Sequence, residues 1–167
     1  MGIRSVYLVR HAIAFERGQD WPDDARRPLT HKGAARMREV VDGLLALDVE
    51  LDLVVTSPFV RAKQTADLLI AGWPEPPALV VSAALAPGAL PTSVTDVLSQ
   101  HTQAEGVALV GHEPGLGELA AWLIGARHPL KFKKGGVARI DVPMLPVSGS
   151  GELIWMATPK MLRAMTR

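Results

Sequence analysis

The stretch that decides the fold is Val6-Tyr7-Leu8-Val9-Arg10-His11-Ala12. Its unbroken run of β-prone apolar residues predicts a buried strand of a parallel sheet. Ligands of open α/β sheets bind at the carboxyl ends of the strands, and this run ends in Arg10 and His11. An arginine fork matches phosphate, and a histidine can be a nucleophile, an acid or a base. The pair marks a candidate site, provided that the rest of the chain supplies partners.

A second apolar run, residues 51–56, leads into a helix that contains Arg61. Ser57 and Pro58 predict the N-cap and the first residue of that helix. Arg61 would then lie close to exposed amides and to the positive end of the helix dipole, where an anion is favoured. Gln64 and Thr65 follow at helical spacing, on the same face as Arg61 or next to it. An ordinary surface arginine is an equally good interpretation until a third motif is considered.

The third motif follows the apolar run 107–110, which ends in Gly111-His112-Glu113-Pro114. A helix follows, marked by Pro114 and a periodic apolar pattern. A zinc-protease interpretation of His112-Glu113 fails, because position 116 is leucine. A two-histidine metal site stays open but lacks an evident third ligand, so no metal or other cofactor is expected.

The segment 12–29 should lie over the site, because it follows the first strand end. Arg26 or Arg27 could contact an anion there, although a solvated loop is the favoured interpretation. The remaining elements are a helix from N-cap Thr30 to about residue 45, a strand 79–82, an uncharged loop 83–91, a short helix 92–100, strands 137–142 and 153–157 joined by a turn at 148–151, and a basic tail 159–167. Lys131, Lys133 and Lys134 are interpreted as a solvated turn rather than a binding patch.

Composition limits the alternatives. A chain of 167 residues with 48% hydrophobic and 21% charged residues suits one domain, residues 1–167. A net charge of +1 argues against nucleic acid and against a polybasic membrane anchor. No cysteine is present, so disulfides, thiolate metal sites and a cysteine nucleophile are excluded. No signal peptide or membrane span is recognisable, and a cytoplasmic location is expected.

Three motifs together resemble the histidine phosphatase (phosphoglycerate mutase-like) superfamily. They are Leu8-Val9-Arg10-His11, the segment from Ser57 to Thr65, and Val110-Gly111-His112. Arg10-His11-Ala12, Arg27-Pro28-Leu29-Thr30 and Ser57-Pro58-Phe59 look most like its small branch of protein phosphohistidine phosphatases. The resemblance implies an α/β fold, a three-layer αβα sandwich with a mostly parallel central sheet. It also implies that His11 is the phosphorylated nucleophile and that Arg10, Arg61 and His112 complete a pocket for phosphate.

The proton donor for the leaving group is not evident. Many relatives carry a glutamate in the loop after the third strand, whereas residues 85–91 contain no carboxylate. Glu113 is one candidate, because other branches carry an acidic residue after the second histidine; a helix-start role is its alternative. Otherwise the leaving group needs little help, which favours an imidazole leaving from phosphohistidine.

The sequence therefore predicts a metal-independent phosphatase with an open site. The preferred partner is a phosphorylated protein, such as a histidine-phosphotransfer domain. Small phosphorylated substrates and a phosphoprotein-binding module without turnover are the alternatives.

Overall fold

The computed structural model describes residues 2–167 and has a six-stranded sheet at its centre. In chain order the strands are β1 (Ile3–Arg10), β2 (Leu53–Thr56), β3 (Ala78–Val81), β4 (Gly106–Gly111), β5 (Val137–Pro143) and β6 (Glu152–Ala157). Their spatial order is β3-β2-β4-β1-β5-β6. The first four are parallel to one another, β5 runs antiparallel to β1, and β6 pairs antiparallel with β5 and so runs in the direction of the first four. The expected mostly parallel sheet is confirmed.

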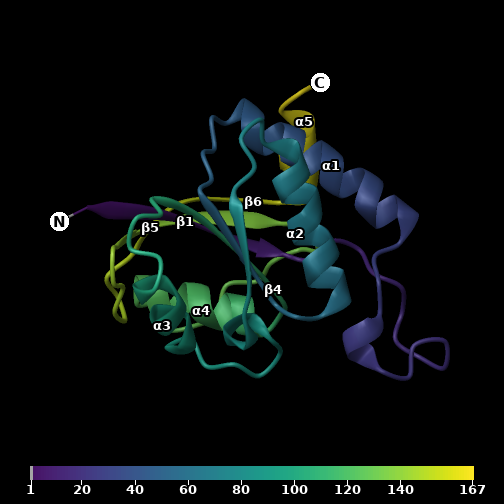
Figure 1. Cartoon of the computed structure of the whole chain (residues 1–167), viewed down its shortest axis with the longest axis horizontal. Coiled ribbons are helices and arrows are strands. Elements are labelled where there is room, and N and C mark those ends of the chain that lie inside the picture. The colour runs from purple at the N-terminus through teal and green to yellow at the C-terminus, as the bar shows by residue number, and fades with distance from the viewer. Residues whose placement is uncertain (1) are drawn as a thin grey trace.

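Helices cover both faces of the sheet (Figure 1). One face carries α1 (His31–Ala46), α2 (Val60–Gly72) and α5 (Pro159–Ala164), and the other carries α3 (Ser93–Ser99) and α4 (Gly115–Ile124). Alternation along β1 explains how one strand serves both layers: Tyr7 and Val9 join the core cluster beneath α1 and α2, whereas Val6 and Leu8 join the cluster beneath α4. The chain is a single three-layer αβα domain.

The start of α1 follows the sequence pattern. The Thr30 side chain accepts a hydrogen bond from Gly33 N–H, which makes Thr30 the expected N-cap. Gly33 is required at that position, because a Cβ atom there would collide with the carbonyl oxygen of Ile13. The helix thus packs directly against the segment that follows the first strand.

The start of α2 differs from the prediction. The helix begins at Val60, Phe59 is its N-cap, and no side chain caps it. Ser57 instead accepts the N–H of Phe59 through Oγ, at 3.2 Å, and forms a turn before the helix. The N-cap role of Ser57 and the first-turn role of Pro58 are therefore wrong.

The C-terminal residues also differ from the prediction of a basic tail. They form α5, whose N-cap Thr158 accepts the N–H of Met161. Leu162 is fully buried, and Gly43 of α1 admits its backbone, because a Cβ atom at Gly43 would collide with the Leu162 carbonyl. An ion pair of 2.9 Å between Arg163 and Glu39 adds to this packing. Among residues 2–167, no helix combines the length and apolar character needed to cross a membrane.

Candidate active site

The register of the parallel strands brings three chain segments to one edge of the sheet. Arg10 of β1 stands opposite Gly111 of β4, so His11 and His112 leave adjacent strands at the same level. The backbone N–H of His11 donates to the Gly111 carbonyl at 3.1 Å, and that of Ser57 donates to Val110 at 3.0 Å. The expectation that these strand ends meet is confirmed.

His11 is held in one tautomer. Its Nδ1 lies 2.7 Å from the carbonyl oxygen of Ala12, which can only accept, so Nδ1 carries the proton. The Nε2 atom then has a free lone pair, which accepts the Nε–H of Arg61 at 3.3 Å. An unprotonated Nε2 is the form that a nucleophilic histidine needs.

Electrostatics keep both histidines neutral. Burial and, to a lesser extent, the positive charges of Arg61 and Arg10 together lower the pKa of His11 to about 3. Burial and then the charge of Arg61 lower the pKa of His112 to about 3 as well. Nearby guanidinium groups were the expected cause of a low pKa at His11; they contribute, but desolvation dominates.

His112 faces His11, with ring centroids 5.2 Å apart. Its Nε2 lies 2.7 Å from Ser57 Oγ, which already accepts the N–H of Phe59. A hydroxyl oxygen has two lone pairs, so this contact allows either direction; with the hydroxyl as the donor to Nε2, the proton of His112 resides on Nδ1. That Nδ1 is buried and has no partner within residues 2–167, so in this tautomer it is a buried donor without an acceptor.

Arg10 is the second group with an unused donor. Its Nη1 donates to the Phe132 carbonyl at 2.7 Å, whereas its buried Nε has no partner in the described chain. The backbone N–H of Gly135 bonds to the carbonyls of Arg10 and His11 at 3.1 Å each, which fastens the segment 131–136 against the site. Within this segment Lys131 and Lys133 are exposed, as a solvated turn predicts.

Arg61, the second residue of α2, is almost fully buried, with 2% of its surface exposed. Its guanidinium is clamped by Asp24: Nη1 donates to the backbone carbonyl at 2.8 Å and Nη2 to Oδ2 at 3.0 Å. Burial alone would raise the pKa of Asp24, but the hydrogen bonds and charges of Arg27 and Arg61 outweigh it and lower this pKa. Asp24 is thus an ionised partner of the site.

Asp24 was missed from the sequence, because its loop has no periodic pattern. The loop 12–29 contains a short 3₁₀ helix, Asp24–Arg26, which carries the carboxylate to Arg61. Arg27 is buried rather than solvated, since its Nε donates to Asp24 Oδ1 at 2.9 Å and its Nη1 to the Phe15 carbonyl at 2.7 Å. The favoured solvated-loop interpretation is wrong for Arg27, whereas Arg26 is exposed.

Gln64 and Thr65 lie next to Arg61 on α2 and hold the same loop. Thr65 Oγ1 accepts the N–H of Ala12 at 3.1 Å and donates to the Arg61 carbonyl at 2.8 Å. Gln64 Oε1 accepts the N–H of Leu29 at 2.8 Å. One helix face therefore fastens the beginning, the middle and the end of loop 12–29.

Glu113 makes contacts of a helix-start residue. Its Oε1 accepts the N–H of Gly117 at 2.8 Å, in the first turn of α4, and its Oε2 accepts the N–H of Phe132 at 3.4 Å. Both oxygens thus face backbone donors. The role of Glu113 as a proton donor stays a prediction.

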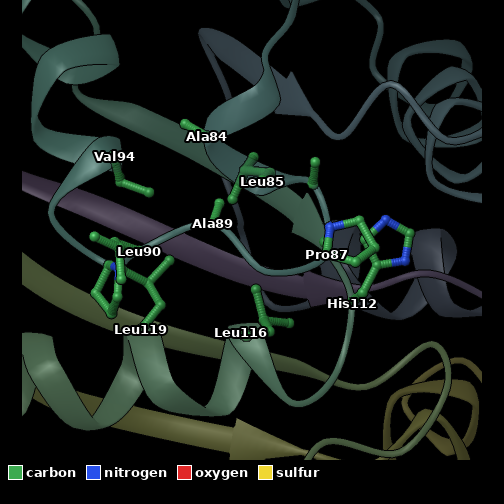
Figure 2. A pocket seen from close by; sticks show the side chains of 13 residues that line it. Ala84, Leu85, Pro87, Ala89, Leu90, Val94, His112, Leu116 and Leu119 are labelled. Carbon is green, nitrogen blue, oxygen red and sulfur yellow. The ribbon is translucent and has the colours of Figure 1, made fainter.

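An apolar pocket opens beside His112 (Figure 2). Its lining comes from the uncharged loop after β3, from α3 and from the first turns of α4, and includes Leu85, Pro87, Leu90, Val94, Leu116 and Leu119. No charged side chain lines it. His11 and His112 themselves are only 5% exposed, so the site is less open than the chain length suggested.

Metal ligands do not gather at this edge of the sheet. In the part of the chain that the structure describes, no group of three or more His, Cys, Asp or Glu side chains could hold a metal ion. The cations that surround the histidines are arginines.

Comparison with known proteins agrees with this geometry. The family model of the histidine phosphatase superfamily (branch 1) matches residues 6–85. The phosphohistidine phosphatase SixA of Escherichia coli (strain K12) is 32% identical over 96% of this chain and 99% of its own length. An uncharacterized protein of Picosynechococcus sp. is also 32% identical, over 94% of this chain and 98% of its own.

A solved structure of the protein histidine phosphatase SixA complexed with tungstate superimposes with a TM-score of 0.82. Its identity to this chain is 28%, and the match covers 93% of this chain and 97% of that one. The chain therefore belongs to the histidine phosphatase superfamily and is of the SixA type. It is a phosphatase, which sets aside a binding module without turnover.

Proposed function

We propose that the chain is a protein phosphohistidine phosphatase that works through a phosphorylated His11. One observation carries this proposal: the site has a nucleophile and cationic donors that could bind a phosphoryl group, but no carboxylic acid free to protonate a leaving group. Of the two carboxylates described above, Asp24 is ionised by its arginine partners and Glu113 accepts two backbone amides. Neither is poised to give a proton to an alkoxide.

The first step forms a bond between His11 Nε2 and phosphorus and breaks the bond to the leaving group. The Nδ1–H bond to Ala12 keeps the Nε2 lone pair available, as described above. Arg10 Nε and His112 Nδ1, two buried groups of the site without partners within residues 2–167, donate to the phosphoryl oxygens. Arg61 supplies a second guanidinium, and charge stabilisation of this kind is most of what phosphoryl transfer requires.

The second step transfers the phosphoryl group from His11 to water and releases inorganic phosphate. The leaving group of the first step decides the substrate class. An imidazole nitrogen can carry its proton before the bond breaks, whereas an alkoxide needs a donor at that moment. A site without a free acid therefore suits a P–N bond on a protein better than the P–O bond of a sugar phosphate.

The accessible surface of the site fits the same substrate. Both histidines are only 5% exposed, so a phosphoryl group must reach them on a projecting side chain or a small molecule. The relative SixA is named a phosphohistidine phosphatase, which is consistent with the first possibility.

The test compares turnover of a phosphorylated histidine-phosphotransfer domain with turnover of sugar phosphates and nucleotides. We expect the phosphohistidine domain to give the higher kcat/KM by at least about 10²-fold, the lower limit of help that a general acid gives. A sugar phosphate or nucleotide turned over as fast would replace the proposal by a small-molecule phosphomonoesterase.

A further inference from the structure

Asp24 lies where a positioning residue for Arg61 would be needed. The Arg61 guanidinium donates three hydrogen bonds, two to Asp24 and one to His11. The contact to His11 must break during the reaction, because the His11 lone pair attacks phosphorus. The two contacts to Asp24 are then the ones that keep the guanidinium in place.

An unheld arginine is a poor phosphate ligand. Its long side chain carries about 2 kcal/mol of rotamer entropy, which is lost when a substrate orders it. Contacts that order the side chain before binding remove this loss from the binding step. Burial of Arg61 alone does not fix the orientation of its guanidinium group. The hydrogen bonds to the backbone carbonyl and the carboxylate of Asp24 fix it.

The carboxylate is itself held in place. Arg27 donates to Asp24 Oδ1, leaving Oδ2 for Arg61, and Arg27 is buried by its second bond to the Phe15 carbonyl. Arg17 adds only a longer contact of 3.5 Å and is mostly exposed. The chain of contacts runs from the loop backbone through Arg27 and Asp24 to the reacting edge of the sheet.

We propose that Asp24 is a positioning residue that aligns the Arg61 guanidinium for the phosphoryl group before substrate binds. This inference rests on the proposed role of Arg61 as a phosphate ligand. Loop 12–29 thereby becomes part of the catalytic apparatus, because its 3₁₀ helix carries Asp24. Two residues of α2, Thr65 and Gln64, fasten the two ends of this loop.

The two possible roles of Asp24, as a negative charge and as a positioning residue, predict opposite effects of its removal on the affinity for an anion. If Asp24 acted only through its negative charge, its removal would strengthen the binding of tungstate, because a repulsion would vanish. If Asp24 positions Arg61, Asp24→Asn weakens tungstate binding, and kcat/KM on p-nitrophenyl phosphate falls about 10- to 100-fold, the usual cost of a small misplacement.

The neighbouring carboxylate offers a matched control. Asp23 caps the same 3₁₀ helix by accepting the N–H of Ala25, yet it has no contact with Arg61. Asp23→Asn removes one charge from the same turn, so we expect nearly unchanged turnover and tungstate affinity. Thermal unfolding of each variant separates a loss of activity from a loss of fold.

A double-mutant cycle on tungstate affinity, measured by calorimetry, completes the test. Arg61→Ala should weaken binding, and adding Asp24→Asn to it should weaken binding no further. Equal or tighter binding by Asp24→Asn alone, or an additive loss in the double variant, would overturn the inference. If Arg61→Ala binds tungstate like the wild type, the proposed role of Arg61 fails, and the inference fails with it.

Asp24→Glu covers the case in which Asp24→Asn does not fold. It keeps the charge and displaces the carboxylate by one methylene. We expect turnover to fall while the unfolding temperature stays near that of the wild type. Full activity of Asp24→Glu would show that charge rather than position matters.

Discussion

Two loops flank the site and differ completely in charge. Loop 12–29 carries Asp24 and Arg27 to Arg61, whereas residues 83–91, which line the pocket beside His112, carry no charge. One side of the site thus carries paired charges, and the lining that the other side gives to the pocket contains no carboxylate that could donate a proton. The proposed function assigns the phosphate chemistry to the first loop and the choice of leaving group to the second.

The largest effect on turnover should come from replacing the proposed nucleophile, His11. We expect His11→Ala to abolish turnover, because the unprotonated Nε2 of His11 lies beside Arg61, whereas Nε2 of His112 is occupied by the Ser57 hydroxyl. The fold should survive, which circular dichroism can check. Activity above a few per cent of wild type would contradict the assignment of His11.

A carboxylate placed in the uncharged loop should change the substrate class. Pro87 lines the pocket together with His112, and Pro87→Glu would bring an acid to this side of the site (Figure 2). We expect it to raise kcat/KM for an alkyl phosphate about 10-fold or more, since general acids contribute about 10²–10⁴-fold when well placed.

Pro87→Gln is the control, because it changes the loop without adding an acid. Equal changes in both variants would mean that the absence of a carboxylate does not limit alkyl phosphate hydrolysis.

Glu113→Gln should have a smaller effect. Because Glu113 accepts two backbone amides, we expect a loss below about tenfold that is similar for a sugar phosphate, p-nitrophenyl phosphate and phosphohistidine. The three values of kcat/KM are measured at one pH. A selective loss of about 10²–10⁴-fold on the sugar phosphate would make Glu113 the general acid.

Acid should destabilise the fold through the two buried histidines. Each has a folded-state pKa of about 3, below the ordinary 6.5, so the unfolded chain binds more protons between these values. Stability is therefore complete above pH 6.5 and is lost as the pH falls toward 3, by up to about 1.4 kcal/mol per unit for each histidine.

Urea unfolding of wild type and His112→Asn between pH 7.5 and 4.5 measures this slope. The variant should lose stability less steeply as the pH falls. Parallel curves would show that His112 does not stay neutral in the folded protein.

The smallest effect should be that of chelation. Arg10 and Arg61 supply the positive charge that a metal would bring to a phosphoryl group. We expect EDTA to leave turnover unchanged. A loss that one divalent metal restores would contradict the metal-independent mechanism.

The sequence was a reliable guide where periodicity or strand ends carry the information. Arg10, His11 and His112 follow continuous apolar runs, and parallel pairing must bring such ends together. Arg61 was predicted correctly as a helical residue near the site. The helix starts later than predicted, at Val60, and the Ser57 hydroxyl bonds to His112 instead of capping the helix.

The role of Asp24 and the presence of α5 could not be predicted from the sequence, because both depend on tertiary contacts. Asp24 lies in a loop, and its importance depends on a contact 37 positions away in the chain. The helix α5 forms because Leu162 packs against α1 at Gly43, a tertiary contact that local propensity does not encode. The apolar pocket depends likewise on how α3, α4 and the loop after β3 meet.

The central claim, that the leaving group departs without a proton from the enzyme, has a direct test. It is the dependence of kcat/KM on leaving-group pKa across a series of aryl and alkyl phosphates, with a phosphorylated imidazole as the P–N member. We expect kcat/KM to fall steeply as the leaving-group pKa rises, and the phosphorylated imidazole to be turned over far faster than alkyl esters. A shallow dependence, with alkyl esters hydrolysed as fast as aryl esters, would contradict it.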